Sequence, residues 1–428
     1  MTIAQIIMVV VLLLMISGKV PLYLTAAVGA TIAALVAGFP LTGGVASPAT
    51  GANVSVALLF QRGLHSVILD MMGVLLFVGV MDKAGFLTTI IYKIMHVGAR
   101  AGGGPGVATA GGIAAGMIGG LTGFTQPAIT GVITGPPAVK LGVDKNIVAG
   151  ILGHAGHLGN FGGFTHPTIV AVIATAGITF GMINVIGAIC ALAIFAASFV
   201  RLRRLMKKEG LSVAGSDVKL ETEDTGISFG KAIFPFIVLI VGFTLGVPVV
   251  VMGIASALLT ILLSTKNFKL GEKDMIEGLT RITVPLFATV SFLYMSAVIL
   301  EIGLSAMIAT ALGPGLEAAP LIVMFLVGSI AGLITQSNGA SIPIIIPVLA
   351  IIVGPGFGVH PLAAAVAAAA GPAIMQYYIT GGPVAALATV IPIIEGSDLT
   401  LANRFQRPSI LIGLLVAFVI TMLLGIIL

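Results

Sequence analysis

The sequence contains few charged residues and almost no cysteine. Only 8% of its 428 residues are charged and 58% are hydrophobic, whereas an ordinary soluble domain carries about 25% charged residues. This balance excludes a soluble globular protein and predicts a polytopic protein of the lipid bilayer. The single cysteine, Cys190, lies in an apolar run and has no second thiol to pair with. A disulfide framework and a thiolate metal site are therefore excluded.

Two further absences narrow the class of protein. The sequence has no nucleotide-binding motif, so ATP-driven transport would need a separate subunit. Met1 leads directly into an apolar run, without a basic region or a small-residue cleavage site. We therefore expect a retained membrane span rather than a signal peptide. The net charge of +5 is explained by membrane topology below, so we expect no nucleic-acid partner, and we expect no cofactor.

The apolar runs are long enough for membrane helices of about 20 residues, which predicts an all-α fold. Their order repeats along the chain. We predict two inverted repeats, each with five transmembrane helices and one re-entrant hairpin. The first repeat covers residues 1–200 and the second covers residues 231–428. Between them, residues 201–230 are polar, carry the basic run RLRRLMKK and are predicted to form a cytoplasmic linker.

Two pairs of matched interruptions support the duplication. The stretches GMIGGLTGFTQPAIT and GLITQSNGASIPIII can be aligned so that Pro127 falls on Pro343, an offset of 216 residues (343 − 127). The stretches GNFGGFTHPT and YYITGGPV place Pro167 on Pro383 with the same offset (383 − 167 = 216). Internal symmetry of this kind is typical of secondary transporters, in which broken helices of the two repeats form one shared site.

The distribution of basic residues predicts the topology. If Arg201–Lys208 is cytoplasmic, 19 of the 20 basic residues lie on the cytoplasmic side and only Arg62 lies outside. An odd number of crossings in each repeat then inverts the second repeat and places both termini outside. We expect the protein to be in the inner, or cytoplasmic, membrane.

The polar interruptions predict an anion site. Unwound backbone is tolerated in a bilayer only where it is buried in protein or lines a wet cavity, and half-helix N-termini attract negative charge. Pro127, Pro167, Pro343 and Pro383 each follow an interruption, where proline suits the first helical turn. No Lys or Arg lies in the interruptions, so neutral groups must bind the anion. The candidate substrate-binding residues are Thr122, Gly123, Thr125, Gln126, Asn160, Thr165, Ser337, Asn338, Gly339, Ser341 and Thr380.

The small residues of these stretches have a simpler explanation, because glycine and threonine also allow membrane helices to pack closely. For Gly106–Gly120 close packing and a role in the site are equally compatible with the sequence. Packing alone does not explain Gln126, Ser337 and Asn338 at the hairpin tips.

Three histidines at membrane depth, His154, His157 and His166, are candidates for coupling. Histidine is the side chain that titrates near neutral pH, so these residues could carry a proton or contact the substrate. The alternative is a hydrogen-bonded structural role. Without a nearby carboxylate they make a poor metal site, and no metal is expected.

Other polar residues are open to two interpretations. For Asp70 and Glu301, at the ends of their spans, we expect a solvated role. Tyr377 and Tyr378 could donate hydrogen bonds to the site or serve as packing aromatics.

The order of spans, surface arm, hairpin and broken helix resembles the ion-transporter superfamily of elevator-type carriers. The stretches MMGVLLFVGVMDKAGF and GFTHPTIVAVIATAGITFG most resemble the gluconate permease family and, more distantly, the lactate and citrate permeases. The resemblance implies a homodimer with a fixed scaffold and a moving transport domain. It also implies a small organic anion, such as a sugar acid or another carboxylate, as substrate.

The coupling ion is less clearly indicated. SNGAS, at Ser337–Ser341, resembles the Ser-Asn-Thr tips of sodium-coupled dicarboxylate carriers, with Gly339 in place of threonine, whereas TGFTQ at the other tip lacks such a pair. We therefore favour a proton-coupled symporter, with sodium coupling possible.

Three other functions are weighed against this one. A sodium-coupled dicarboxylate or citrate-type carrier would use the hairpin-tip oxygens. A cation/proton antiporter usually needs a carboxylate in its broken helices, and the interruptions contain none. An intramembrane enzyme would leave the repeat unexplained and would lack an acid beside its serines and histidines, so we expect no enzyme.

Overall fold

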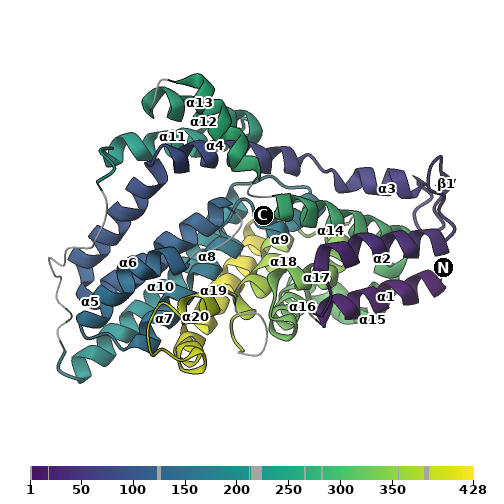
Figure 1. Ribbon diagram of the computed structural model, residues 1–428. Helices are drawn as coiled ribbons and strands as arrows, with labels where there is room; N and C mark the ends of the chain where they lie inside the picture. The colour runs from purple at the N-terminus through teal and green to yellow at the C-terminus, as the bar shows by residue number, and fades with distance from the viewer. Residues whose placement is uncertain are drawn as a thin grey trace.

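The computed structural model describes residues 2–17, 19–122, 127–211, 213, 224–264, 267–280, 283–354, 356–379 and 385–428. These residues are mostly helical (Figure 1). The exception in the described ranges is one antiparallel hairpin of β1 (Val45–Ala46) and β2 (Asn53–Val54), in which Val45 is opposite Val54. The predicted all-α fold is confirmed for the described residues, apart from this small hairpin.

The first half follows the predicted order of spans. Its helices are α1 (Thr2–Ile16), α2 (Leu22–Val36), α3 (Val56–Gly63), α4 (Val67–Lys83), α5 (Phe86–Thr122), α6 (Pro127–Lys140), α7 (Lys145–Gly153), α8 (Ala155–Phe161), α9 (Pro167–Ala176) and α10 (Met182–Lys208). Helix α10 continues through the basic run to Lys208, so the first part of the predicted linker is helical. A hydropathy pattern detects only the apolar part of a helix. Lys and Arg are good helix formers, so the helix can continue beyond that part into water.

The second half shows a similar order. Its helices are α11 (Phe229–Thr244), α12 (Val249–Ser264), α13 (Phe268–Thr280), α14 (Thr283–Glu301), α15 (Leu304–Ala318), α16 (Pro320–Thr335), α17 (Asn338–Ile352), α18 (Pro361–Met375), α19 (Ala385–Val390) and α20 (Leu399–Ile427). The sequence did not predict α3 or α13. Both are short, and α13 is too polar to read as a span.

Few helices are long enough to cross a bilayer alone. Among the described residues α10 and α20 qualify by length and hydropathy, and two bent pairs qualify if each is one broken span. These pairs are α3 with α4, bent by 41°, and the Leu286–Glu301 part of α14 with α15, bent by 74°. Seven shorter apolar helices accompany them. The composition and these helices fit a multi-pass membrane protein, while the exact number of crossings stays a prediction.

The helices form two groups (Figure 1). The outer group consists of α1–α4 and α11–α14. The inner group consists of α6–α10, α16–α20 and the part of α5 that follows its kink at Gly103. Within the outer group α4 packs extensively on α12 and α13, and a Cβ at Gly73 or Gly79 would overlap the backbone of Val250 or of Asp274 and Gly278. Glycine thus permits close helix packing there. Each sequence half contributes to both groups.

Two kinks recur in the two halves. Gly103 in α5 has φ 55° and ψ −137°, and Gly313 in α15 has φ 54° and ψ −145°. Glycine adopts such a positive φ at little cost, and in each helix a proline follows closely, Pro105 or Pro314. Each kink precedes a helical hairpin. The matched kinks support the proposed duplication, although their spacing of 210 residues (313 − 103) differs from the 216 residues between the aligned prolines.

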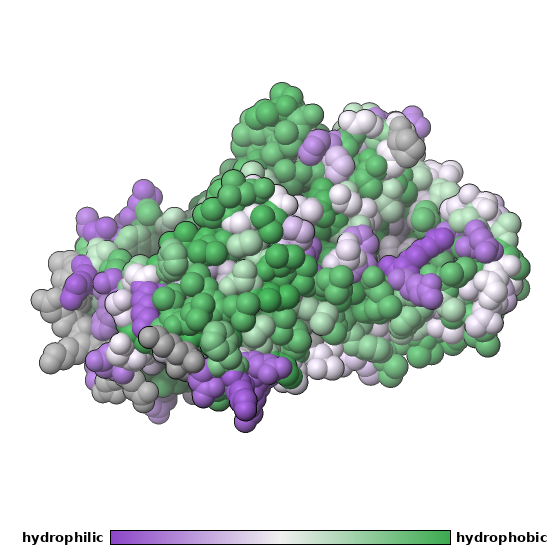
Figure 2. Space-filling model, turned by 90° about the horizontal axis from the view of Figure 1, so that it is seen from above, coloured by the Kyte–Doolittle hydropathy of each residue, from purple (hydrophilic) through white to green (hydrophobic). Residues whose placement is uncertain are grey.

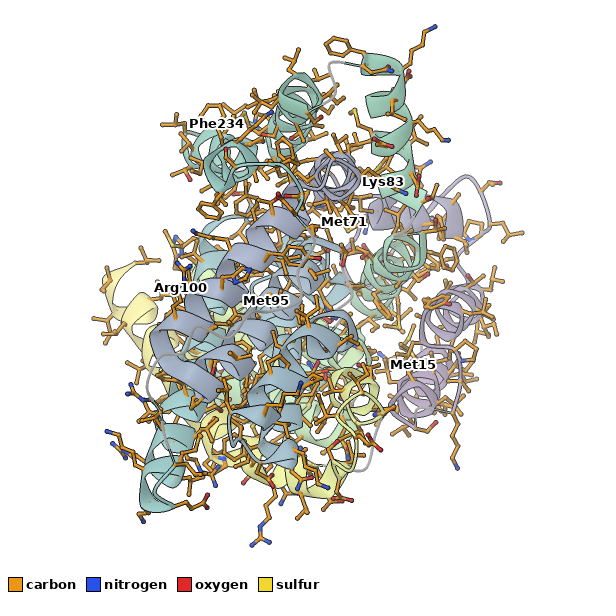
Figure 3. The ribbon with its side chains drawn as sticks, turned by 60° about the vertical axis from the view of Figure 1, so that its left-hand side comes forward. Met15, Met71, Lys83, Met95, Arg100 and Phe234 are labelled. Atoms are coloured by element: carbon orange, nitrogen blue, oxygen red, sulfur yellow. The ribbon has the colours of Figure 1, made fainter. Side chains whose placement is uncertain are left out.

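The surface is largely apolar, as a bilayer requires. Figure 2 shows a face that is mostly hydrophobic, with its hydrophilic residues gathered mainly toward the ends. Figure 3 labels Phe234 on α11, whose side chain is exposed, and Met71 and Met95, which are buried on α4 and α5. It also labels Lys83 at the end of α4, which forms an exposed ion pair of 2.7 Å with Glu277 of α13.

Candidate functional site

The candidate site lies where the first broken helix meets the tip of the second hairpin. The first interruption separates α8 from α9, and the tip separates α16 from α17; α9 packs against α17. The side-chain Nδ2 of Asn338 lies 3.3 Å from His166 Nδ1 and donates to the carbonyl of Asn160 at 3.4 Å. Three of the predicted site residues are thus brought together, from positions far apart in the sequence.

The two helix N-termini at the site are capped by side chains. Pro167 is the first residue of α9, as predicted, and His166 Nδ1 accepts a hydrogen bond of 3.3 Å from the N–H of Thr168. Helix α17 begins earlier than predicted, because Ser337 Oγ accepts from the N–H of Ala340 at 3.3 Å and starts the helix at Asn338. Pro343 therefore lies in the second turn, and its assignment to the first turn was wrong. Pro127 does begin α6.

The tip itself is held by a compact set of hydroxyl groups. The hydroxyls of Thr335 and Ser341 lie 2.9 Å apart, and each lies 2.9 Å from the carbonyl oxygen of Ser337. Gln336, between the two arms, has φ 49°, a conformation that is uncommon outside glycine. Ser337 and Ser341, both predicted as substrate ligands, therefore organise the tip in this state.

The end of α18 supports both parts of the site. Gln376 Oε1 accepts a hydrogen bond of 2.9 Å from the backbone N–H of Asn338, and its Nε2 donates to Ala373 O at 3.2 Å. The neighbouring Tyr377 accepts at its hydroxyl from Asn160 Nδ2, at 2.9 Å. Sequence reasoning missed Gln376, although a glutamine ending an otherwise apolar helix was a usable signal. Tyr377, one of its candidates, is buried in the site.

The first hairpin approaches the same interruption. The N–H of Phe164 donates to Gly120 O at 2.8 Å, and buried Asn184 of α10, also missed, donates to Gly163 O at 2.7 Å. Thr122 is half-buried and donates to Ile118 O of its own helix at 2.8 Å. The other candidates of the first tip and the second interruption, Gly123, Thr125, Gln126 and Thr380, lie outside the described residues, as does Pro383. The helices that follow these two stretches, α6 and α19, are in contact.

A cavity of about 260 Å³ lies beside the first interruption. Leu158, Phe164 and Asn184 line it from the inner group, and Phe236 and Phe243 line it from α11 of the outer group. Apart from Asn184 the lining is almost entirely apolar. The cavity thus lies between the first interruption and the outer group, which are also in contact through the rings of Phe164 and Phe243, with centroids 6.2 Å apart.

His154 and His157 lie together, with ring centroids 5.4 Å apart. Ser198 Oγ donates to Ser409 Oγ at 2.7 Å, so at its 2.8 Å contact with His154 Nε2 it must accept. His157 Nδ1 must donate to the carbonyl of Ala373, at 3.3 Å, because a carbonyl cannot donate. Each ring thus donates from one nitrogen, while the other nitrogen, Nδ1 of His154 and Nε2 of His157, has no hydrogen-bond partner among the described residues.

Several buried polar atoms have no hydrogen-bond partner among the described residues. They include those two ring nitrogens, Asn338 Oδ1 and the hydroxyl of Thr165. A buried polar atom without a partner costs about 1–3 kcal/mol. The described ranges contain no group of three His, Cys, Asp or Glu residues that could hold a metal ion. The unsatisfied atoms instead mark a place that a polar ligand or a proton would stabilise.

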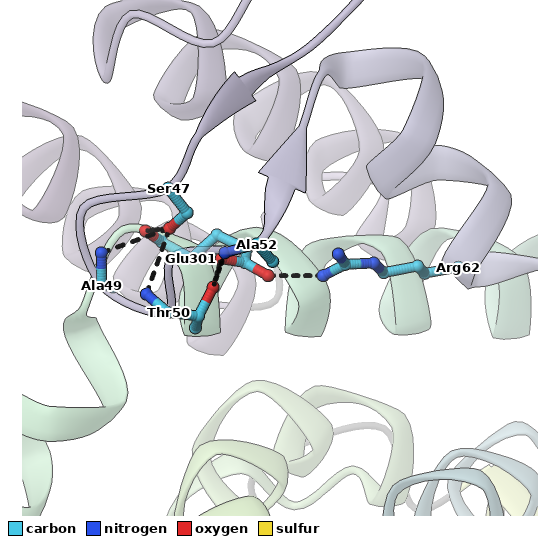
Figure 4. Close-up of polar contacts among 6 residues, drawn as sticks. All are labelled: Ser47, Ala49, Thr50, Ala52, Arg62 and Glu301. Atoms are coloured by element: carbon cyan, nitrogen blue, oxygen red, sulfur yellow. Dashed lines mark hydrogen bonds and ion pairs between the residues drawn. The ribbon is translucent and has the colours of Figure 1, made fainter.

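The expectation of a solvated Glu301 was wrong. Its side chain is 1% exposed and bonds to Arg62 and to the Thr50 hydroxyl, while Ser47 Oγ donates to its backbone carbonyl at 3.1 Å (Figure 4). This cluster ties the β1–β2 loop and α3 to the end of α14. Asp70 also has a structural contact, since its Oδ1 accepts from the N–H of Val250 in α12 at 3.0 Å.

The glycine-rich arm of the first hairpin serves packing. A Cβ at Gly111 would overlap Thr134, one at Gly112 would overlap Phe195, and one at Gly116 would lie 2.8 Å from Leu158 Cβ. Gly339, at the other tip, is different: among the described residues its Cβ would meet only Leu22 Cδ1 of α2, at 3.8 Å.

The fold is similar to two solved structures. One is the YdaH transporter of Alcanivorax borkumensis, with a TM-score of 0.58 and 15% sequence identity over 99% of this chain and 98% of that chain. The other is MtrF of Neisseria gonorrhoeae, described with a class of antimetabolite efflux pumps, with a TM-score of 0.54 and 13% identity over 96% of each chain. The chain therefore shares the fold of these two proteins, both of which are described as transport proteins and not as enzymes. The likeness gives no support to the resemblance to the gluconate permease family. No protein-family model matches the sequence, and no curated protein matches it.

Proposed function

We propose that the protein is a secondary active transporter of a small organic anion, such as a sugar acid or another carboxylate. The observation that carries the proposal is the meeting of two helix N-termini, those of α9 and α17, at the contact between His166 and Asn338. Each N-terminus carries a partial positive charge of about half an elementary charge. The hydrogen bonds among the described residues of the site join neutral groups only, so an anion there would meet donors and no competing carboxylate.

The arrangement of the helices supports alternating access of the elevator type. The site is built by the inner group, and its second hairpin tip faces Leu22 of the outer group. We propose that the inner group moves as a transport domain against the outer group as a scaffold, in a homodimer of the inner membrane. The dimer, its membrane and the inverted repeat rest on the sequence and on the family resemblance.

Proton coupling is the mechanism that the histidines favour. His154 and His157 are buried, and one ring nitrogen of each has no hydrogen-bond partner among the described residues. No carboxylate of the described residues forms a hydrogen bond or an ion pair with either ring. A proton on either ring would be an uncompensated buried charge, which is costly. An incoming carboxylate supplies the compensating charge, so proton and anion stabilise each other and travel together.

Sodium coupling is the second candidate. It is favoured by Asn338 Oδ1 and the Thr165 hydroxyl, which are buried oxygens without a partner among the described residues. The hydroxyls of Thr335 and Ser341, which a sodium ion would also need, are already bonded within the tip. The direction of transport is open as well, since MtrF is described with efflux pumps.

Transport in proteoliposomes tests the proposal. Purified protein would be reconstituted, and uptake of labelled gluconate, lactate and citrate would be measured with a pH gradient or a sodium gradient imposed separately. We expect accumulation of at least one of these anions under an inwardly directed proton gradient. Accumulation that requires sodium and ignores pH would assign coupling to the tip oxygens, and absence of movement of every anion under both gradients would contradict the proposal.

A further inference from the structure

We propose that Gln376 is a latch for the second hairpin, and that its amide oxygen holds the position which an oxygen of the transported anion takes. The first statement concerns the protein without substrate and stands by itself. The second rests on the proposed function. Gln376 follows the last residue of α18, Met375, and directly precedes the interruption YYITGGPV, so it was not among the candidate residues of the sequence.

The latch is a single hydrogen bond at the start of a helix. Asn338 is the first residue of α17, where a backbone N–H has no acceptor within its own helix. Gln376 Oε1 accepts from this N–H at 2.9 Å, and its Nε2 is held by Ala373 O at 3.2 Å. Gln376 is 6% exposed, so water does not compete for the bond. The tip is thereby fastened to the end of α18.

An anionic oxygen would be a better partner for the same N–H. Hydrogen bonds to an ionised acceptor are roughly twice as strong as those to a neutral one, and the helix dipole favours the negative charge further. A carboxylate that enters the site can therefore displace Gln376 Oε1. The exchange leaves α17 bonded to the substrate and no longer to α18.

The side chain of Asn338 gives a second, independent reason to expect a ligand at the tip. Asn338 Oδ1 is buried without a hydrogen bond to any described residue, while Asn338 Nδ2 is committed to Asn160 O and His166 Nδ1. The amide nitrogen of the Asn338 side chain is thus hydrogen-bonded, whereas its amide oxygen bonds to no described residue. Its backbone N–H is satisfied only by the residue that we assign as the latch.

The position of the tip gives the latch a role in transport. Gly339, next to Asn338, lies beside Leu22 of the outer group. Tyr377, next to Gln376, accepts from Asn160 at its hydroxyl and from Asn403 Nδ2 of α20 at its carbonyl, at 2.6 Å. Exchange at Gln376 thus changes a bond within the inner group, next to the tip residue that lies beside the outer group.

Thiol labelling at the tip tests the latch without any substrate. Gly339→Cys would be placed in a Cys190→Ala background, because Cys190 is the native cysteine and a Cβ at Gly339 has room. We expect Gln376→Ala to raise the rate of labelling with a maleimide several-fold. Gln406→Ala is the matched control, since Gln406 is an equally buried glutamine that bonds to Gly150 O, away from the tip. An equal rate in the Gln376→Ala and parent proteins, both monodisperse, would overturn the latch.

Binding of gluconate, lactate and citrate tests the shared position. If Gln376 competes with the anion, Gln376→Ala should bind the preferred anion as tightly as wild type or more tightly. Gln376→Glu, which places a negative charge there, should bind it at least about tenfold more weakly. Equal weakening in both variants would overturn the competition and indicate a purely structural residue. Absence of binding of every anion to wild type would overturn the proposed function and the competition together, while the labelling result still decides the latch.

Discussion

Asn338 and His166 lie side by side although 172 positions separate them in the chain, with Asn338 Nδ2 3.3 Å from His166 Nδ1. His166 Nδ1 also accepts from the N–H of Thr168 at 3.3 Å. Since both partners are donors, this nitrogen carries no proton and the ring hydrogen is on Nε2. A proton on Nδ1 would break the cap of α9 and the link to α17 at once. The contact therefore joins the protonation state of a histidine to the position of the hairpin tip.

The first prediction concerns the histidine pair. Replacing His154 and His157 with glutamine keeps hydrogen bonding but removes the titratable ring. We expect accumulation driven by a pH gradient to be lost, while exchange of labelled for unlabelled anion remains measurable. Both are followed in proteoliposomes. A double variant that still concentrates the anion under a pH gradient alone would rule out these residues as the proton carriers.

A second prediction uses a close contact beside the site. A Cβ at Gly156 would overlap the phenol ring of Tyr377, so Gly156→Ala should displace Tyr377 and leave Asn160 Nδ2 without its acceptor. The expected loss is about 1–3 kcal/mol for the unsatisfied amide alone. Gly339→Ala, which has room for a methyl group, is the control. Thermal unfolding in detergent should separate the two variants, and equal melting temperatures would refute the packing argument.

A third prediction concerns the ion pair at the end of α14. Glu301→Gln keeps the shape of the side chain but removes the charge that pairs with Arg62, so we expect a loss of about 1.5–3 kcal/mol. In the control, Glu277→Gln, the pair with Lys83 is exposed on both sides, and the loss should be below about 1 kcal/mol. Anion affinity should be unchanged in both. If the two variants melt at the same temperature, the Glu301 cluster contributes no special stability.

Topology gives a fourth prediction. The basic residues predict that Arg201–Lys208, the last turns of α10, lie on the cytoplasmic side and that both termini lie outside. Single cysteines placed at each location would be labelled from one side with an impermeant reagent. A C-terminus that reacts only from the cytoplasmic side would contradict the predicted number of crossings.

The sequence predicted most of the helices because the bilayer makes hydropathy a strong signal. It also predicted that Asn160, His166 and Asn338 belong to one site, since unwound polar segments in a membrane need one another. The predicted helix boundaries were wrong where individual side chains, and not hydropathy, determine where a helix begins or ends. Ser337 caps α17 and moves its start ahead of Pro343, and the helical basic residues extend α10 beyond its apolar part.

The individual side-chain contacts across helix interfaces could not be predicted from the sequence. Glu301 is buried because α3 and the β1–β2 loop bring Arg62, Thr50 and Ser47 around it. Gln376 reaches the N-terminus of α17 only because α18 packs on α16 and α17. Such contacts depend on how helices pack, and a hydropathy pattern carries no information about which side chain meets which across an interface.

The most direct test of the account is the affinity of the Asn338→Ala variant for the anion that wild-type protein transports. The variant loses the side chain that joins α17 to His166 and Asn160. Without these buried hydrogen bonds the N-terminus of α17 is no longer held at the site, and we expect a cost of about 1.5–3 kcal/mol, or roughly ten- to a hundredfold in affinity. Ser256→Ala is the control, because Ser256 is a buried residue of α12 in the outer group. By isothermal titration calorimetry we predict binding about ten- to a hundredfold weaker in Asn338→Ala and unchanged in Ser256→Ala. Wild-type affinity in a correctly folded Asn338→Ala variant would contradict the account.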